Sequence, residues 1–172
     1  MKKFQWQTAV LAFILTLGVA VGVVYLRRQH FLHEPLLKRI KALEAVEEVK
    51  MEHDRKAVVV SLNSVDNIAE TYQALKKQIT TDLGPEYRLE LVDKRDEVLE
   101  AAYQEVHLLL YEAQQRGNYA EAGKEISQIL SEYNLEHLLL IDDENIYLQI
   151  QNQEAYLYEI IARRHRKEGE YV

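Results

Sequence analysis

The spacing of hydrophobic and polar positions along this 172-residue chain changes several times, and the first change sets apart an apolar run near the N-terminus. Residues 8–26 hold no charged side chain, and eleven of these nineteen residues are Val, Leu, Ile or Phe. A nineteen-residue helix is about 28 Å long, close to the roughly 30 Å hydrocarbon core of a bilayer. Trp6 and Tyr25 flank the run, where interfacial aromatic residues are expected. The pattern predicts a transmembrane anchor over 8–26, behind a short tail at 1–7.

The flanks of this run bear on whether it is cleaved and how it is oriented. A small-x-small cleavage motif is present at Ala20-Val21-Gly22, but four more apolar residues and then Arg27 and Arg28 follow it, which favours an uncleaved anchor. The larger number of basic residues after the run favours a domain in the cytoplasm, whereas the Met-Lys-Lys start is typical of an exported bacterial chain. We expect the second arrangement, with the domain outside the cytoplasm.

Gly18 and Gly22 stand four residues apart inside the predicted anchor. This small-xxx-small spacing lets two transmembrane helices approach closely. Glycine is also frequent in such helices, so a chance spacing is the alternative. The spacing favours a homodimer through Gly18 and Gly22 as a hypothesis.

The chain after a joint at 27–34 predicts one α+β domain over 35–162, followed by a charged tail at 163–172. The first part of the domain has the order helix, strand, strand, helix, strand, which is typical of helices packed on one face of a sheet. Pro35 suits the start of the first helix. Apolar residues alternate with charged ones over 87–91, which predicts the last strand of this set.

The middle of this first part combines a strand hairpin with a helix. Two runs rich in β-branched residues surround the polar turn 53–56, which indicates the hairpin. Asn63 and Ser64 then offer a helix N-cap, and apolar residues recur at three and four positions over 66–80. These signals predict an amphipathic helix directly after the hairpin.

A helical hairpin is predicted next. Apolar residues keep helical spacing over 96–115 and again over 119–133, and the break at Gly117 between them is short. Two helices joined by so short a turn pack antiparallel.

The last third predicts another strand hairpin. The strands span 138–141 and 146–150 around the polar turn 142–145, and an amphipathic helix over 155–164 follows. A third strand at 156–161 is the alternative, because aromatic and β-branched residues fit both structures there. If the helix is present, the last third repeats the pattern of the first part, which would indicate internal duplication.

The charges are divided unevenly between the two ends of the chain. Residues 1–41 hold seven Lys or Arg and one acidic residue, whereas residues 42–172 hold 14 Lys or Arg and 27 acidic residues. The acidic domain disfavours a nucleic-acid partner and a position flat on anionic lipid. The chain has no cysteine, which excludes a disulfide scaffold.

Candidate chemistry is sparse. His30 and His33 have the spacing of metal ligands on one helix, but they lie at the predicted membrane joint beside a single acid, so a solvated pair is the prediction. Residues 142–145 are rich in oxygen ligands but lack the loop length, glycine and terminal acid of an EF-hand, so we predict a hairpin turn. Nucleophile and phosphate-loop motifs are missing from the sequence. We therefore expect no enzyme activity, no cofactor and no metal.

Three of the eleven tyrosines are candidate interaction residues. Tyr147, Tyr156 and Tyr158 cluster near one predicted hairpin, where they form either an exposed aromatic patch at a protein interface or part of the core. Together with Gly18 and Gly22 they complete the candidate interaction site.

The order of elements behind a single anchor looks broadly like the small α+β modules of bacterial envelope and secretion assemblies, a resemblance of architecture alone. It implies a non-enzymatic protein-interaction or scaffold subunit, which binds the lipid bilayer through residues 8–26 and contacts other membrane or envelope proteins. The alternative is a membrane-anchored sensory or small-ligand-binding domain.

Overall fold

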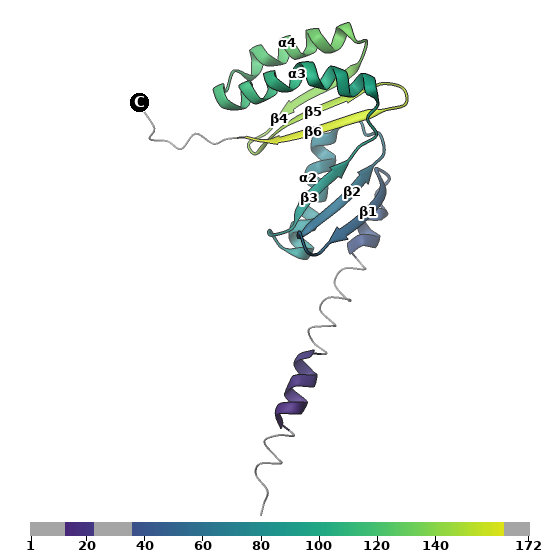
Figure 1. Ribbon diagram of the computed structural model, residues 1–172, viewed down its shortest axis with the longest axis vertical. Helices are drawn as coiled ribbons and strands as arrows, with labels where there is room; N and C mark the ends of the chain where they lie inside the picture. The colour runs from purple at the N-terminus through teal and green to yellow at the C-terminus, as the bar shows by residue number, and fades with distance from the viewer. Residues whose placement is uncertain (1–12, 23–35, 164–172) are drawn as a thin grey trace, which may run out of the picture.

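The computed structural model describes residues 13–22 and 36–163 (Figure 1). The predicted tail 1–7, the joint 27–34 with its two histidines, both ends of the predicted anchor and residues 164–172 lie outside the described residues. After a short helix at 36–41, the elements are β1 (Val46–Glu52), β2 (Ala57–Leu62), α2 (Ile68–Leu83), β3 (Arg88–Val92), α3 (Glu97–Arg116), α4 (Tyr119–Glu132), β4 (Glu136–Ile141), β5 (Asn145–Gln151) and β6 (Tyr156–Ala162). The predicted α+β class is confirmed.

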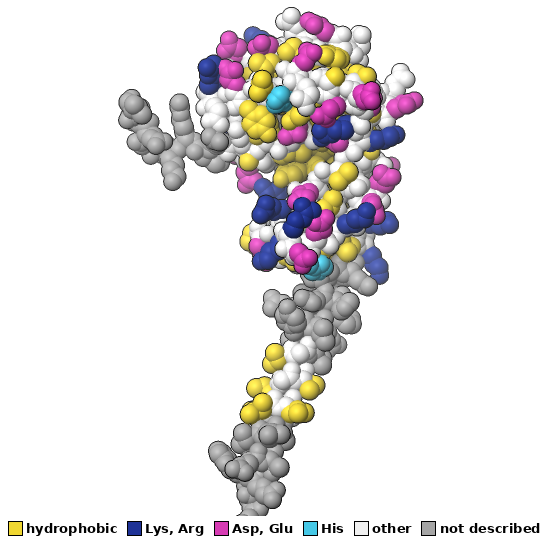
Figure 2. Space-filling view, viewed as in Figure 1, with side chains coloured by type: hydrophobic (Ala, Val, Ile, Leu, Met, Phe, Trp, Pro, Cys, Tyr) yellow, Lys and Arg dark blue, Asp and Glu magenta, His cyan; other side chains and the backbone are white. Residues whose placement is uncertain are grey.

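Strands β1, β2 and β3 form the first sheet, in that order. β1 and β2 are the predicted antiparallel hairpin, and α2 crosses over so that β3 lies parallel to β2. The apolar residues Val58, Val60 and Leu62 of β2 are buried in a core with α2 and the helix at 36–41. The opposite face holds Lys50 and Glu90 beside Val59, and Figure 2 shows charged side chains gathered over this sheet.

The helix after this hairpin begins later than predicted. Asn67, and not Asn63 or Ser64, is its N-cap, since the Asn67 side chain accepts hydrogen bonds from the backbone N–H of Ala69 (3.0 Å) and Glu70 (3.3 Å). Asn63 instead continues the sheet, because its N–H donates to the carbonyl of residue 45. An Asn can serve either purpose, so the sequence offers two candidate caps four residues apart.

Strands β4, β5 and β6 form a second sheet, an antiparallel meander with β5 at its centre. Helices α3 and α4 cover one face, and α2 with the first sheet lies against the other (Figure 1). Six of the seven residues of β5 are buried as a result. The first sheet thus has one buried face, as expected for the first part of the domain, whereas the second sheet is buried on both faces.

The predicted helix over 155–164 is wrong, and the alternative of a third strand is confirmed as β6. Its apolar residues do not alternate with polar ones because neighbours face two different cores, Leu157 toward α3 and α4 and Tyr158 toward α2. The Asn152 side chain accepts hydrogen bonds from two N–H groups of the β5–β6 turn, at residues 154 and 155 (2.9 and 2.8 Å), and so closes a turn between strands. The hypothesis of internal duplication fails at this point.

The predicted helical hairpin is confirmed as α3 and α4. Asp96 caps α3 through a 2.8 Å hydrogen bond from the N–H of Leu99. Gly117 ends α3 in the left-handed conformation (φ 76°), and its N–H donates to the carbonyl of Ala113 (2.7 Å). A non-glycine residue adopts this conformation at a cost, so the break predicted at Gly117 has a local cause.

Within the predicted anchor, residues 13–22 form a helix whose large apolar side chains are exposed and belong to neither core. In the part of the chain that the structure describes, none of the helices combines the length and apolar character needed to cross a bilayer. The anchor over 8–26 therefore stays a prediction.

Candidate functional site

Of the two positions left open for the three tyrosines, the core is the one found, and they form no exposed patch. Tyr147, Tyr156 and Tyr158 are only 1%, 8% and 4% exposed, and all three belong to the core between the two sheets. The rings of Tyr156 and Tyr158 stack with centroids 5.4 Å apart. The three tyrosines do lie together, as expected, and they lie in the core.

The tyrosine hydroxyl groups attach the second sheet to the segment that links β2 and α2. Tyr156 Oη donates to the carbonyl of Leu62 (2.6 Å), while Tyr158 Oη accepts from the N–H of Val65 (2.9 Å) and donates to the carbonyl of Asn63 (3.2 Å). Burial is the main cause that raises the pKa of Tyr158 to about 12. Both tyrosine side chains are therefore neutral at physiological pH, and their role is structural.

Gln149 of β5 completes this junction and was missed by sequence reasoning. It is 3% exposed; its Oε1 accepts from the N–H of Ile68 (3.0 Å) at the start of α2, and its Nε2 donates to the carbonyl of Val65 (2.6 Å). A Gln between apolar residues of a strand was the available signal, since a buried amide requires partners.

Gly18 and Gly22 lie on the described helix at 13–22, and a Cβ atom at either position would meet nothing within 4 Å. Both positions are open to a neighbouring helix as far as the described residues show. The structure leaves their predicted role in self-association untested.

A polar pocket of about 500 Å³ lies between α2 and the β4–β5 turn. Its lining residues are Gln73, Lys76, Lys77, Thr80, Thr81, Asp142, Asp143, Glu144, Asn145 and Tyr147. Several of these side chains already bind one another: Lys76 pairs with Glu144 (2.7 Å) and Gln73 donates to Asp142 (2.7 Å). The pocket therefore offers few free polar groups to a ligand.

Asp142 is the centre of the β4–β5 turn. Burial alone would raise the pKa of its carboxyl group, but hydrogen bonds from the Tyr147 hydroxyl (2.6 Å), two turn N–H groups and Gln73 outweigh burial and lower this pKa to about 2. The carboxylate thus closes the turn, as the hairpin prediction for 142–145 implied. Among the residues described, no cluster of three or more His, Asp or Glu is placed to hold a metal.

A second hollow, of about 640 Å³, runs between α4 and the edge strand β4. We call it the α4–β4 groove; its lining residues are Tyr119, Ala120, Gly123, Lys124, Ser127, His137, Leu138, Leu139 and Ile141. The lining includes two basic side chains, Lys124 and His137, and no carboxylate. This distinguishes the groove from the predominantly acidic chain.

The backbone of β4 is open on the side away from β5. The N–H of Asp142 donates to the carbonyl of Asn145, so this pair is hydrogen-bonded, and such pairs alternate along an antiparallel ladder. The N–H and C=O groups of His137, Leu139 and Ile141 therefore point away from the sheet. Over the described residues, no hydrogen bond to these outward groups is found.

The other sheet edges are protected. At β6, the N–H of Tyr156 donates to the carbonyl of Lys94 and that of Tyr158 to the carboxylate of Asp93, both at 2.9 Å. The edge strands of the first sheet carry charged residues, namely Glu47, Glu48, Lys50 and Glu52 in β1 and Arg88 and Glu90 in β3. Charges and covering segments are the usual means of preventing edge-to-edge pairing. β4 carries a charge only at its first residue, Glu136, and no described segment hydrogen-bonds to its outer edge.

No family model, no curated protein and no solved structure matches the chain. The α4–β4 groove, with the open edge of β4, is therefore the candidate site on its own physical properties. The sequence carried a signal for it, the uncharged strand residues 137–141, but not the fact that this strand lies at an edge.

Proposed function

We propose that the chain is a single-pass, membrane-anchored protein-interaction or scaffold subunit of a bacterial envelope assembly, without enzymatic activity. The observation that carries the proposal is the open edge of β4 beside the α4–β4 groove. An unpaired, uncharged strand edge is a template for a strand of another chain, and proteins that do not use such an edge block it. The other described edges are blocked and this one is not.

Residues 8–26 form the anchor in this proposal. Support comes from the uncharged sequence and from the helix at 13–22, whose large apolar side chains pack against neither core. Such side chains are stable in lipid or against another membrane helix, and Gly18 and Gly22 provide a close-contact surface for the second case. Alkaline phosphatase fused after Val172 is active if the domain is outside the cytoplasm, and an inactive fusion with an active cytoplasmic reporter reverses the orientation.

In vivo cross-linking tests the interaction site. A photo-reactive amino acid in place of His137 is expected to give discrete adducts with other envelope proteins in native membranes. Ile141→Glu places a negative charge at the open edge and is expected to remove these adducts. The matched control is Val92→Glu, which changes a similarly exposed aliphatic residue at the end of β3 (45% exposed, against 38% for Ile141) and should preserve them. Adducts that survive Ile141→Glu would contradict the proposal.

The second candidate function, a membrane-anchored sensory or small-ligand-binding domain, rests on the 500 Å³ pocket between α2 and the β4–β5 turn. Its size suits a small polar metabolite. Its lining is largely paired already, which makes it the weaker candidate. A melting temperature that rises with a polar metabolite, and that no longer rises in Lys77→Ala, would favour this function instead.

A further inference from the structure

We propose that the α4–β4 groove binds an extended peptide segment of a partner protein, which adds to the second sheet beside β4 and places a carboxylate next to Lys124. This inference rests on the proposed function and names the chemistry of its partner. It is carried by three features of the groove: the direction of the backbone groups, the size of the lining side chains and the sign of their charge.

The backbone of β4 sets the conformation of the partner. Three residues of β4, His137, Leu139 and Ile141, present an N–H donor and a C=O acceptor outward. Six such groups at a spacing of two residues match one extended strand of about five residues. A helical segment keeps its backbone groups internally bonded and cannot satisfy them. The occupant is therefore extended.

The helix α4 selects the side chains of the partner that point into the groove. On this side α4 presents three small residues, Ala120, Gly123 and Ser127, together with the larger Tyr119 and Lys124. A Cβ atom at Gly123 would lie 3.3 Å from Leu139 Cδ2, so the helix and the strand are already in close contact there. Beside that contact the small residues leave room for apolar side chains of an added strand. Every second residue of the partner faces α4, so apolar residues are expected at alternate positions.

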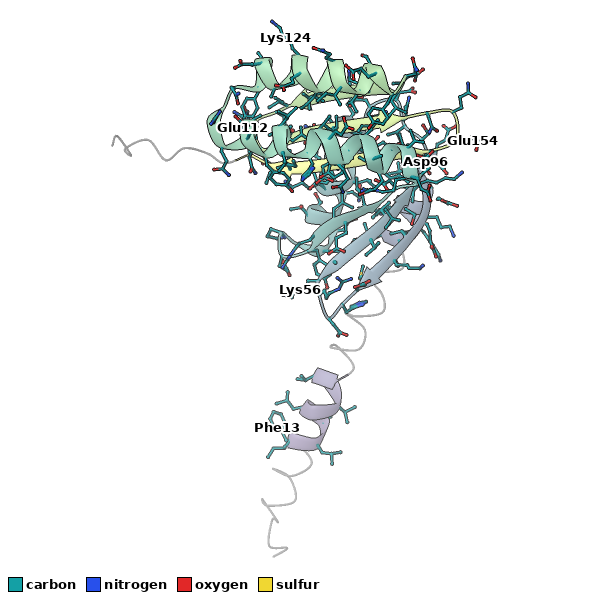
Figure 3. The ribbon with its side chains drawn as sticks, turned by 45° about the horizontal axis from the view of Figure 1, so that its top comes forward. Phe13, Lys56, Asp96, Glu112, Lys124 and Glu154 are labelled. Atoms are coloured by element: carbon teal, nitrogen blue, oxygen red, sulfur yellow. The ribbon has the colours of Figure 1, made fainter. Side chains whose placement is uncertain are left out.

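The charge of the groove selects a carboxylate. Lys124 lies on α4 (Figure 3) and lines the groove, and His137 lines it from β4. The acidic side chains closest along β4 are directed elsewhere: Glu136 accepts from Gln151 (3.1 Å), and Asp142 is held within its own turn. A partner carboxylate thus meets the positive charge of Lys124 in the groove and no acidic lining residue.

A second copy of the chain is a less suitable occupant. Antiparallel pairing of two β4 strands would place the two-fold axis near Leu138 and Leu139, at the centre of the strand. Lys124 follows Gly123, which contacts Leu139, so the two Lys124 side chains would enter one shared groove. Two like charges so close repel each other, whereas the carboxylate of an acidic peptide would pair with the single Lys124 of one copy.

The test uses the full chain in detergent micelles and a fluorescent peptide probe, Thr-Val-Thr-Glu-Thr-Val-Thr, whose Val and Glu residues share one face. We expect it to bind about tenfold more tightly than the same peptide with Lys in place of Glu, as an ion pair exchanged for a repulsion predicts. Lys124→Glu should reverse this preference, and Lys94→Glu, on the β6 side of the sheet, should leave it unchanged. Equal binding of both probes, or a preference that Lys124→Glu does not change, overturns the inference.

Backbone N-methylation of the probe tests strand addition without altering the protein. In an added strand, the backbone N–H groups of alternate residues point toward β4 and those of the other residues point away from it. N-methylation of one set, either Val and Glu or Thr, should therefore abolish binding. N-methylation of the other set should preserve binding. Equal loss with both sets contradicts pairing in a strand.

The outcomes separate this inference from the proposed function. A concentration-dependent dimer that Ile141→Glu abolishes would make a second copy the occupant and overturn the peptide assignment, while the edge remains an interaction site. If the probes do not bind but the cross-links of residue 137 still depend on Ile141, the inference fails and the proposed function stands. If the probes do not bind and the cross-links do not depend on Ile141, the inference and the proposed function both fail.

Discussion

Gln149→Leu is expected to weaken the junction between the two sheets more than any surface substitution. Leucine has nearly the volume of glutamine, so the change removes hydrogen bonds with little change in packing. The lost bonds are those to the N–H of Ile68 (3.0 Å) and the carbonyl of Val65 (2.6 Å), together with a longer one to the side chain of Gln151 (3.2 Å). Ile68 is the first residue of α2 and Val65 lies in the segment just before it, so the change removes a tie between β5 and the start of α2.

The magnitude follows from the burial of Gln149, which is 3% exposed. A backbone group left buried without a partner costs about 1–3 kcal/mol, so two such groups cost about 2–6 kcal/mol. This is a large part of the roughly 5–15 kcal/mol by which a domain is stable. We expect the loss to appear as a lower urea midpoint with an unchanged slope, because the same surface is exposed on unfolding.

The assay is urea unfolding of the full chain in detergent micelles, followed by circular dichroism. Gln128→Leu is the matched control, because Gln128 is an exposed residue of α4 and should change stability by less than about 0.5 kcal/mol. A carboxylate cannot donate to the carbonyl of Val65, so Gln149→Glu should be strongly destabilised at pH 8 and partly recover at pH 5, where the buried side chain takes up a proton. Equal stability of Gln149→Leu and Gln128→Leu would refute the role assigned to Gln149.

Three further predictions concern other parts of the domain. The pKa of Asp142 is lowered from 3.8 to about 2, so its stabilising effect is complete above about pH 5 and is lost as the pH falls through 2; Asp142→Asn should flatten this part of the stability profile measured by urea unfolding. Gly117→Ala should cost about 1 kcal/mol, because the left-handed conformation at φ 76° disfavours a side chain; an unchanged urea midpoint would contradict this. Leu157→Ala, at a fully buried position, should cost about 2–5 kcal/mol, whereas Leu108→Ala, at a position 69% exposed, should have almost no effect in the same assay.

Much of the local structure could be predicted from the sequence. The two strand hairpins, β3 and the pair α3 and α4 lie where the spacing of apolar residues places them, because each element has one dominant period. Asp96 and Gly117 mark the ends of α3 through local chemistry that needs no distant partner. Such elements can be identified one at a time.

β6 and the candidate site could not be predicted in this way. Tyr156 and Tyr158 were candidate surface residues because aromatic side chains suit both a core and an interface, and only the presence of α2 and the first sheet on that side decides for the core. The sequence indicates that residues 137–141 form a strand, but it does not show which strands have a neighbour on each side. The α4–β4 groove was missed for this reason. Strand order depends on contacts between residues far apart in the chain.

By itself, the sequence determined the α+β class, the succession of most elements, the acidic character of the domain and the apolar run at 8–26. These properties depend on composition and on spacings within one element, which side-chain periodicity records directly. The tertiary structure alone decided that there are two sheets, that the tyrosines and Gln149 join them, and that β4 has an open edge while β6 is covered. An edge is defined by the absence of a neighbour in space, and no local pattern of residues determines where a chain leaves one of its strands unpaired.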